Sequence, residues 1–318
     1  MSNYDVVTVG SATLDIFMKS DNFKVMKSET VAGGVAMCEV YGGKMEVEEV
    51  EIESGGGATN CAVSLARKEL KTACISEIGN DPQALIIHRD LEEAEVETRF
   101  LVQEADETTA VSVILIAKDG GRSVMVHRGA SAMLTRGDLP LKDLETRWLH
   151  ISSLGGNLEL LTQLLTWAKE KKIRVSLNPG MKEIKMRQRL LKLLPMVEVL
   201  FVNREEAEKL WEVELSSEKG WRGGKCLGGA KVSVITDGKR GGKIWMGDKS
   251  SFYKGKNLKS VVDSTGAGDA FASGYVAALL YGHNYERAIN WGVENASAVI
   301  KKVGAKKGLL TLAQIKDY

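Results

Sequence analysis

The sequence predicts an α/β protein, with a mostly parallel, doubly wound sheet flanked by helices and a small antiparallel β-sheet set apart from it. Two observations lead to this prediction. Apolar runs of strand length alternate with segments of helical periodicity over most of the chain, and such repeated units form parallel sheets covered by crossover helices. Residues 45–53 and 109–127 instead alternate apolar and polar side chains, which is typical of half-exposed strands.

The predicted elements follow one another in the order that a doubly wound sheet requires. Tyr4–Gly10 is an apolar run that ends in glycine and forms the first buried strand. Outside the small-sheet stretches, the remaining predicted elements are, in chain order, helix 58–70, strand 71–78, helix 81–94, strand 147–153, helix 157–171, strand 174–178, helix 183–193, strand 197–202, helix 204–211, strand 231–236, a hairpin at 242–254, and helices 266–281 and 285–301. Glycines in 214–230 interrupt the helix expected before strand 231–236.

The alternating stretches define a second structural unit. Residues 45–53 carry one apolar face, and residues 109–127 contain the tight turn 118–121, which joins two strands as a hairpin. We therefore expect a main α/β domain formed by 1–10, 54–97 and 129–318, and a β-sheet lid formed by 11–53 and 98–128. The apolar face of such a lid would be exposed to water in a monomer, which predicts a homodimer through the lid.

Composition excludes several classes of function. The 318 residues include 43 basic and 42 acidic side chains, and a net charge of +1 does not indicate a nucleic-acid or membrane partner. The four cysteines have neither metal-ligand nor disulfide-framework spacing, which favours a reducing cytoplasmic location. No apolar run approaches the roughly 20 residues of a membrane span.

Polar residues follow several of the predicted parallel strands. Asp15, Asn178, Asn203, Thr236 and Asp263 each come shortly after a strand. Because the carboxyl ends of parallel strands meet at one edge of a sheet, ligands bind there. The sequence therefore predicts a single active site at this edge.

The segment 263–271 has the most specific chemistry. Gly266, Ala267 and Gly268 come at the start of a predicted helix, where free backbone N–H groups and the helix dipole attract an anion. Asp269 in the same turn would repel a phosphate, but it suits a base that takes a proton from a hydroxyl beside an anion hole. A helix cap with glycines for turn geometry remains the alternative from the local pattern alone.

Four motifs in order resemble those of the ribokinase (PfkB) family of carbohydrate and nucleoside kinases. The segment 263–271 resembles the family's C-terminal signature, and 54–62 resembles its N-terminal Gly-Gly-x-x-x-Asn motif. Between them, 203–208 is similar to the family's Asn-x-x-Glu motif, and 234–241 is similar to its nucleotide-binding strand and turn. The resemblance extends over nearly the whole chain. It implies a ribokinase-like fold and ATP-dependent phosphorylation.

The resemblance also implies an acceptor site under the lid. Its members are Asp15, whose carboxylate suits vicinal hydroxyls, and the motif residues Gly55, Gly56 and Asn60. A solvated loop aspartate is the alternative reading of Asp15 from local sequence. Arg128, just before Gly129, suits contact with a substrate carboxylate or phosphate, although a surface charge at the end of a lid strand is the favoured reading.

The nucleotide side is likewise implied by resemblance. Asn203 and Glu206 lie one helical turn apart and would orient water around Mg²⁺, although a helix N-cap explains the same spacing. Thr236, Gly238 and Gly241 would border ATP, and Asn295 would flank the adenine, with helix packing as its alternative. Asp263 and Thr265 match positions that help to bind K⁺ in family members.

These expectations combine into one function. The chain is expected to transfer a phosphoryl group from ATP to a primary hydroxyl of a small sugar, with Asp269 as base and Gly266–Gly268 as anion hole. One alternative is a nucleoside kinase of the same fold. Another is a non-catalytic sugar- or nucleotide-binding protein, which the carboxylate of Asp269 beside a phosphate site argues against.

Overall fold

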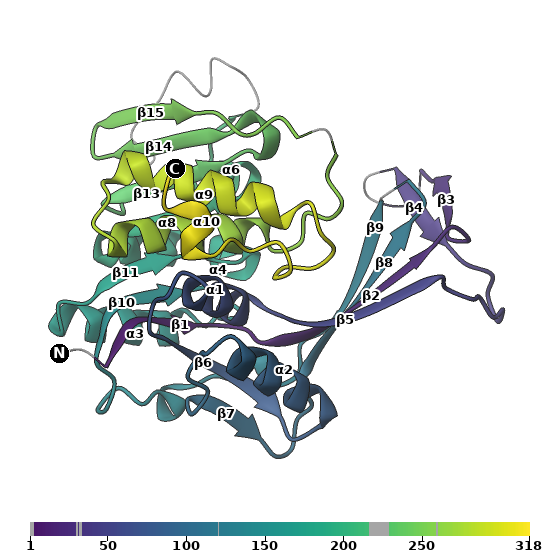
Figure 1. Cartoon of the computed structure of the whole chain (residues 1–318), viewed down its shortest axis with the longest axis horizontal. Helices are drawn as coiled ribbons and strands as arrows, with labels where there is room; N and C mark the ends of the chain where they lie inside the picture. Colours follow the sequence, from purple (N-terminus) through teal and green to yellow (C-terminus); the bar gives the residue numbers. More distant parts are fainter. Residues whose placement is uncertain (1–2, 30, 32–33, 120, 216–228, 259) are drawn as a thin grey trace.

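The main domain is built on one nine-stranded sheet, seen in the computed structural model of the chain (Figure 1). The structure describes residues 3–29, 31, 34–119, 121–215, 229–258 and 260–318. The strands lie in the order β15-β14-β13-β12-β11-β10-β1-β6-β7, with bounds β1 Tyr4–Val9, β6 Thr72–Gly79, β7 Leu101–Glu104, β10 Thr146–Ile151, β11 Arg174–Leu177, β12 Val199–Asn203, β13 Val232–Thr236, β14 Gly242–Met246 and β15 Lys249–Tyr253. The pairings from β13 to β7 are parallel, and β14 and β15 form an antiparallel hairpin at one edge.

Helices cover both faces of this sheet. Their bounds are α1 Gly57–Ala66, α2 Pro82–Glu93, α3 Leu158–Glu170, α4 Met181–Lys185, α5 Arg187–Leu193, α6 Arg204–Trp211, α8 Ala267–Leu280, α9 Tyr285–Val299 and α10 Leu312–Ile315. Successive strand residues point to opposite faces, so Val7 and Leu149 join the core formed with α3, α5 and α6, whereas Val6 and Trp148 join the core formed with α1, α8 and α9. This two-sided burial explains why the strands are apolar runs, and it confirms the predicted fold class.

The lid is a four-stranded sheet that projects from the main domain (Figure 1). Its order is β5-β2-β8-β9, with bounds β2 Thr13–Ser20, β5 Glu49–Gly55, β8 Ala110–Ala117 and β9 Arg122–His127, and a separate pair of strands, β3 Lys24–Lys27 and β4 Val35–Cys38, extends from it. Since β1 ends at Val9 and β2 begins at Thr13, the lid starts at the carboxyl edge of the main sheet.

Three details differ from the prediction. The lid sheet is mixed, because β2 and β8 both run outward from the main domain and pair in parallel. The predicted lid segment that contains Leu101–Glu104 instead forms β7, which pairs with β6 at the edge of the main sheet, while Phe100 and Val102 pack against the main core. The helix predicted over 183–193 is divided at Met186, where the backbone leaves helical geometry.

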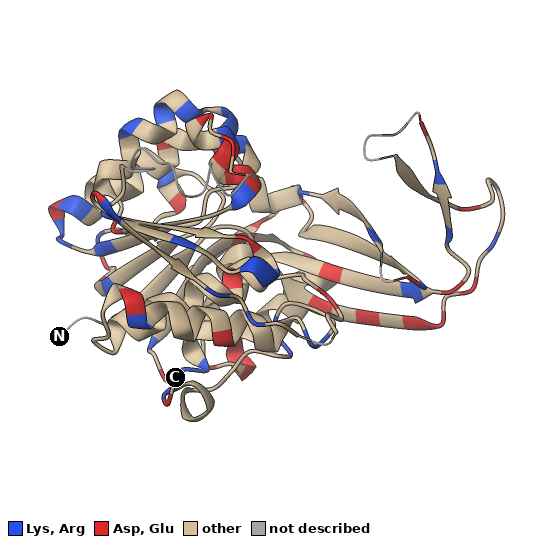
Figure 2. Ribbon diagram, turned by 90° about the horizontal axis from the view of Figure 1, so that it is seen from above, with Lys and Arg blue, Asp and Glu red and all other residues tan. Residues whose placement is uncertain are grey.

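Basic and acidic residues are interspersed over the main domain (Figure 2). The acidic residues of β5 are paired with lysines, as in the ion pair of Glu49 with Lys19 and that of Glu53 with Lys307. No helix in the described ranges is both long and apolar enough to cross a membrane. Most of the glycine-rich stretch 214–230, namely 216–228, lies outside the described residues.

Candidate active site

The N-terminus of α8 has an open backbone. Gly266 is the N-cap with φ 71°, and a Cβ there would lie 2.4 Å from the Cβ of Ala305, so only glycine fits. Gly268 is different, because no heavy atom lies within 4 Å of the position that its Cβ would take. Ala267 and Gly268 both line a cavity of about 380 Å³. The first turn of α8 therefore presents its N-terminal end to a space in which an anion fits.

The carboxylate of Asp269 lies in this first turn and is oriented by one amide. Asn60 Nδ2 in α1 donates a hydrogen bond to Asp269 Oδ2 over 2.9 Å. Burial disfavours the charged form and raises the pKa of Asp269 to about 6, against the smaller opposing effects of Asn60 and Lys306. A carboxylate with this pKa is mostly ionised at neutral pH and remains basic enough to accept a proton.

Asn60 also has an atom free for a ligand. Its Nδ2 is used by Asp269, but its buried Oδ1 has no donor in the described part of the chain. Because buried polar atoms are almost always hydrogen-bonded, this oxygen indicates a missing donor such as a ligand hydroxyl. Sequence reasoning assigned Asn60 to the acceptor, and the structure brings it beside the catalytic candidate.

Asp15 lies on β2 where the lid meets the main domain. Its Oδ1 accepts a hydrogen bond of 3.0 Å from Thr13 Oγ1, and burial raises its pKa. Gly55 on β5 pairs with Thr13, and a Cβ at residue 55 would lie 2.0 Å from Asp15 Oδ2. Gly56 has φ 98°, and a Cβ there would lie 2.4 Å from the carbonyl oxygen of Ser11. Both glycines are thus explained by close contacts within the protein.

Lys306 is a buried cation that the sequence pattern did not reveal. It is only 7% exposed, and its Nζ donates to Ser54 Oγ and to Thr59 Oγ1. Burial lowers the pKa of Lys306 to about 8. Its charge partly offsets the effect of burial on Asp15 and Asp269. No local motif marks this lysine, because only the fold brings the C-terminal loop against α1.

The cavity beside α8 contains the nucleotide residues predicted from the β13 turn. Thr236, Gly238 and Gly241 line it together with the start of α8 and apolar side chains of α8 and α9. Gly241 has φ 90°, and a Cβ there would lie 2.0 Å from the carbonyl oxygen of Tyr253, so the turn is tight. The lining combines apolar walls with one anion-binding end, which suits a flat ring that carries phosphates.

Comparison with known proteins decides the family. The model for "pfkB family carbohydrate kinase" matches residues 4–312. The chain belongs to the PfkB family of carbohydrate kinases. It is thus a phosphotransferase that uses an alcohol group as acceptor.

Individual relatives of this kinase differ in their acceptors. It is 28% identical to a ribokinase of Haemophilus influenzae over 279 residues, which cover 85% of this chain and 89% of that one. It is 30% identical to a cytidine kinase of Thermococcus kodakarensis over 266 residues, covering 79% and 88%. The solved Arabidopsis thaliana ribokinase, complexed with ribose and ATP, has a TM-score of 0.78 at 19% identity and covers 100% of this chain and 98% of that one. The comparisons therefore support a sugar or nucleoside kinase and leave the acceptor open.

Asn203 and Glu206 form a reciprocal helix cap in this kinase. Asn203 Oδ1 accepts from the Glu206 backbone N–H over 2.9 Å, and Glu206 Oε2 accepts from the Asn203 backbone N–H over 2.8 Å. Thr236 pairs with Asn203 across β12 and β13, so these residues share the carboxyl edge of the sheet. No group of three or more His, Cys, Asp or Glu residues in the described ranges could hold a metal directly. A cap with one spare carboxylate oxygen fits contact with Mg²⁺ through water.

Asn295 differs from its predicted role beside the adenine. It is fully buried, with Nδ2 donating to Ala270 O and Ser64 Oγ, and with Oδ1 accepting from Lys68 Nζ and Leu310 N. Its side chain therefore holds α9 against α8 and α1. The same helix reaches the cavity through other residues, namely Val293, Ala296 and Ser297. Helix packing, the alternative reading, is the one that the structure favours.

Asp263 and Thr265 hold an arginine where a K⁺ site was predicted. Arg122 on lid strand β9 contacts Asp263 Oδ1 and Thr265 Oγ1, each at 2.8 Å. Asp263 Oδ1 also accepts from Thr265, and Oδ2 accepts from the Gly304 backbone N–H over 3.0 Å. A potassium ion at this carboxylate would lie beside a guanidinium of like charge. These side chains fit a lid-to-body ion pair and do not fit a potassium site. Sequence reasoning missed Arg122 because its partners Asp263 and Thr265 lie 141 and 143 residues away.

Proposed function

We propose that the protein transfers the γ-phosphoryl group of ATP to a primary hydroxyl of a small sugar. The observation that carries this proposal is the first turn of α8, where Asp269 lies beside a backbone that is open at Gly268. A base and an anion hole in one helical turn are what transfer to a hydroxyl requires. The ribokinase complexed with ribose and ATP, which covers the whole chain, supports this assignment.

The residues divide between donor and acceptor. The cavity of about 380 Å³ at Thr236, Gly238 and Gly241 binds the nucleotide, and the phosphates of the nucleotide extend toward Gly268. Asn203 and Glu206 hold Mg²⁺ through water, and the ion neutralises phosphate charge when it is bound. Asp15 and the free Oδ1 of Asn60 take hydroxyls of the sugar under the lid.

The chemical step needs one proton transfer. The sugar oxygen attacks the γ-phosphorus in line, and the bond between the γ-phosphorus and the ADP oxygen breaks. The hydroxyl proton passes to Asp269. The backbone N–H groups of Gly266–Gly268 stabilise the negative charge on the transferring group. The lid, joined to the body through Arg122 and Asp263, limits the access of water and so limits hydrolysis of ATP.

A panel of acceptors tests this function. ADP release with Mg·ATP is measured with ribose, fructose, 2-keto-3-deoxygluconate, adenosine, cytidine and inosine. We expect the largest kcat/KM with a sugar. A larger value with a nucleoside would favour the second candidate, which the 30% identity to a cytidine kinase supports. Binding of ATP without ADP release on any acceptor would overturn the proposal in favour of a non-catalytic binding protein.

The pH dependence follows from the pKa of Asp269. The base acts only when ionised, and burial raises its pKa from 3.8 to about 6. At saturating Mg·ATP, kcat/KM for the acceptor is therefore expected to fall about tenfold per pH unit below pH 6 and to level off above pH 7. The profile is measured from pH 5 to 8. Residual activity of Asp269→Asn serves as control and should lack this acid limb, and a wild-type profile that stays flat to pH 5 would contradict the assignment.

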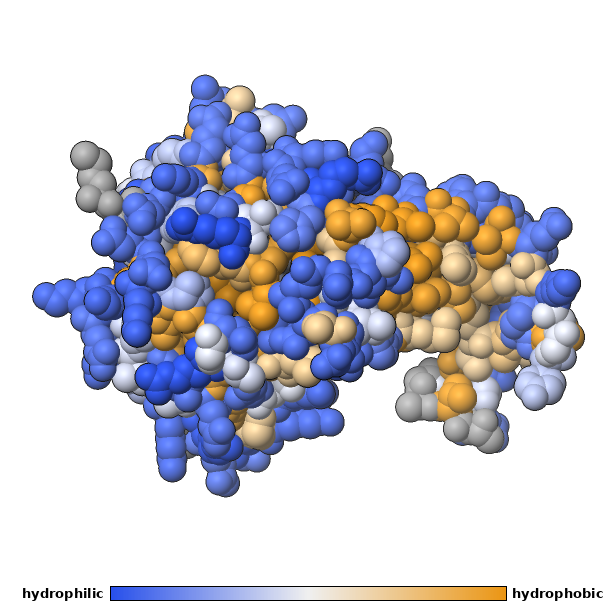
Figure 3. All heavy atoms as spheres, turned by 90° about the horizontal axis from the view of Figure 1, so that it is seen from below, coloured by the Kyte–Doolittle hydropathy of each residue, from blue (hydrophilic) through white to orange (hydrophobic). Residues whose placement is uncertain are grey.

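The lid is proposed to form a homodimer through its outer face. Ile52, Ile16, Val113 and Met125 form one row across the four strands, and Val50, Met18 and Leu115 form most of the next. Ile52 and Met125 are 52% and 54% exposed, and the space-filling view shows apolar atoms gathered over the lid (Figure 3). An apolar sheet face of this kind is typical of an interface.

Substitution of Ile52 tests the dimer. We expect sedimentation velocity to give a dimer for the wild type at micromolar concentration and a monomer for Ile52→Glu, because the carboxylate would be buried unpaired. Val124→Glu is the matched control, because Val124 is similarly exposed but pairs with Ile114 on the inner face, the face that Phe17 shares. A wild-type monomer, or loss of the dimer in the control alone, would contradict this interface.

A further inference from the structure

We propose that the acceptor carries an anionic group, a phosphate or a carboxylate, and that Arg128 binds it. This inference rests on the proposed kinase function and specifies the class of its acceptor. It assigns a binding role to a residue whose position alone suggested a surface charge. Three observations support it: the face of the lid on which Arg128 lies, its lack of a counter-ion, and the way in which its backbone is held.

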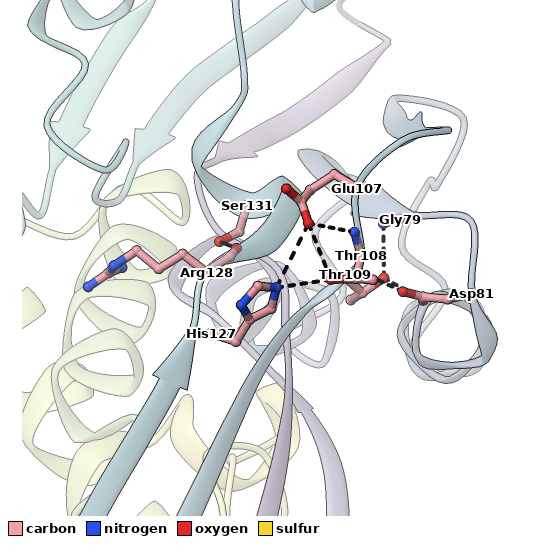
Figure 4. Close-up of polar contacts among 8 residues, drawn as sticks. All are labelled: Gly79, Asp81, Glu107, Thr108, Thr109, His127, Arg128 and Ser131. Carbon is pink, nitrogen blue, oxygen red and sulfur yellow. Dashed lines mark hydrogen bonds and ion pairs between the residues drawn. The ribbon is translucent and has the colours of Figure 1, made fainter.

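The strand register, together with the direction of its side chain, places Arg128 on the acceptor face. Asp15 pairs with Ser112 on β8, and Ser112 pairs with Val126 on β9, so these residues form one row. The side chains of Asp15 and Ser112 lie on the same side of the sheet, because the Asp15 carboxylate accepts hydrogen bonds from Thr13 and Ser112. Arg128 follows His127, the last residue of β9, with helical backbone (φ −84°, ψ −28°), so strand alternation does not fix its direction. Alternate residues of a strand share a face, so His127 lies on the face opposite to Asp15, and Figure 4 shows the Arg128 side chain extended away from His127, toward the side of Asp15.

The distance between Asp15 on β2 and the end of β9, where Arg128 follows, suits a small acceptor. Neighbouring strands lie about 4.8 Å apart, so β9 is on the order of 10 Å from β2. A sugar whose hydroxyls contact Asp15 covers much of that interval, and a long arginine side chain covers the rest. Ser112, on β8 between the two strands, is half-buried, and Val126 on β9 is 51% exposed, so this surface is accessible to a ligand. The end of the sugar that is remote from Asp269 would thus meet the guanidinium.

Arg128 has no counter-ion among the described residues. Glu107, an acidic residue at the same strand end, lies 3.8 Å from His127 Nε2 and accepts from the Thr108 backbone N–H over 2.8 Å. Thr108 Oγ1 lies 2.9 Å from the same ring nitrogen of His127. Figure 4 shows these side chains gathered on one side of the strand end, with Arg128 extended away from them. The exposed guanidinium is therefore available to a ligand anion, which it can bind through two parallel hydrogen bonds.

The backbone around Arg128 is fixed by local contacts. Ser131 Oγ donates to the carbonyl oxygen of Arg128 over 2.6 Å, and the backbone N–H of Ala130 donates to the Thr108 carbonyl over 2.9 Å. Gly129 has φ 43°, and a Cβ there would lie 2.1 Å from that carbonyl. The turn therefore holds the base of the arginine in one place where the lid joins the main domain. Such anchoring reduces the entropy lost when the side chain binds.

Matched acceptors and variants test the proposal. Ribose is compared with ribose 1-phosphate, and fructose with fructose 6-phosphate, in the ADP-release assay with wild type, Arg128→Gln and Arg128→Lys. We expect the wild type to have at least a tenfold lower KM for the anionic member of the better pair. Arg128→Gln should raise that KM by about 10- to 100-fold, the usual effect of losing a charged hydrogen bond, while Arg128→Lys restores part of it. The KM values for the neutral sugar and for Mg·ATP should stay unchanged.

The control is Arg136→Gln, which removes another exposed arginine from the following 3₁₀ turn. Equal KM values for the neutral and anionic members in the wild type would overturn the proposal, as would an Arg128→Gln variant that affects both members alike. Failure of the kinase function is distinguished by calorimetry of binding. If no acceptor gives ADP, weaker binding of only the anionic sugar to Arg128→Gln would still support the anion site, and unchanged binding would overturn it.

Discussion

Asp269→Asn is expected to lower kcat by about 10²- to 10⁴-fold, the usual contribution of a general base. Asparagine has the same shape but cannot accept the proton of the attacking hydroxyl. The fold should be retained. Burial raises the pKa of Asp269 to about 6, so ionising this carboxylate in the folded protein lowers the free energy of unfolding. This destabilisation is absent below the pKa of the unfolded chain, near 3.8, and is fully present above about pH 6. The neutral side chain removes that cost, so the thermal midpoint at pH 7 should stay equal or rise.

The measurement is ADP release at saturating acceptor and Mg·ATP, with thermal unfolding of the same samples. Asp248→Asn is the matched control, because Asp248 is exposed in the turn between β14 and β15 and lies outside the cavity lining. Its kcat should equal that of the wild type. An Asp269→Asn enzyme with kcat within threefold of the wild type would show that another group takes the proton.

Gly268→Val is expected to lower kcat/KM for Mg·ATP by about 10²- to 10³-fold, the usual effect of losing an anion-hole donor. The Cβ position of Gly268 opens onto the cavity with no heavy atom within 4 Å, so an added side chain occupies space that the phosphates would use. The same open space means that the folded protein loses no contact. The effect should therefore appear in catalysis and nucleotide binding and not in stability.

A graded series makes this test sharper. Gly268→Ala should lie between the wild type and Gly268→Val in its KM for Mg·ATP, because the added volume increases in steps. Gly137→Val is the control, since the atom nearest to its Cβ position is 3.6 Å away and it lies outside the cavity lining. If Gly268→Val binds and turns over Mg·ATP normally, the phosphates do not pass over this turn.

The elements of the main domain could largely be predicted because their signals are local. Strand runs such as Tyr4–Val9 and the glycines before α8 are read from neighbouring residues, and the observed bounds lie within a few residues of the predicted ones. The class of reaction was indicated by the first turn of α8 together with the resemblance of four ordered motifs, because the local pattern alone also allowed a helix cap. The close approach of Asn60 to Asp269, across 209 residues, agrees with two motifs that had been assigned to one site.

The remaining features depend on contacts between distant segments. The periodicity of α9 does not show which of its residues faces the cavity, so Asn295 was placed toward the nucleotide although it lies in the core. Leu101–Glu104 has a strand pattern that fits either sheet, and only its pairing with β6 decides. Arg122 and Lys306 look like ordinary surface charges until the fold brings Asp263 to the first and Ser54 to the second.

On the proposed function, the chain separates donor and acceptor recognition between two structural units. The proposed donor contacts come from the main domain, at the β13 turn and the start of α8, whereas the proposed acceptor contacts Asp15 and Arg128 lie on or beside lid strands, with Asn60 added from α1. Exchanges on the lid can therefore alter which alcohol is accepted while the machinery for handling phosphate stays intact.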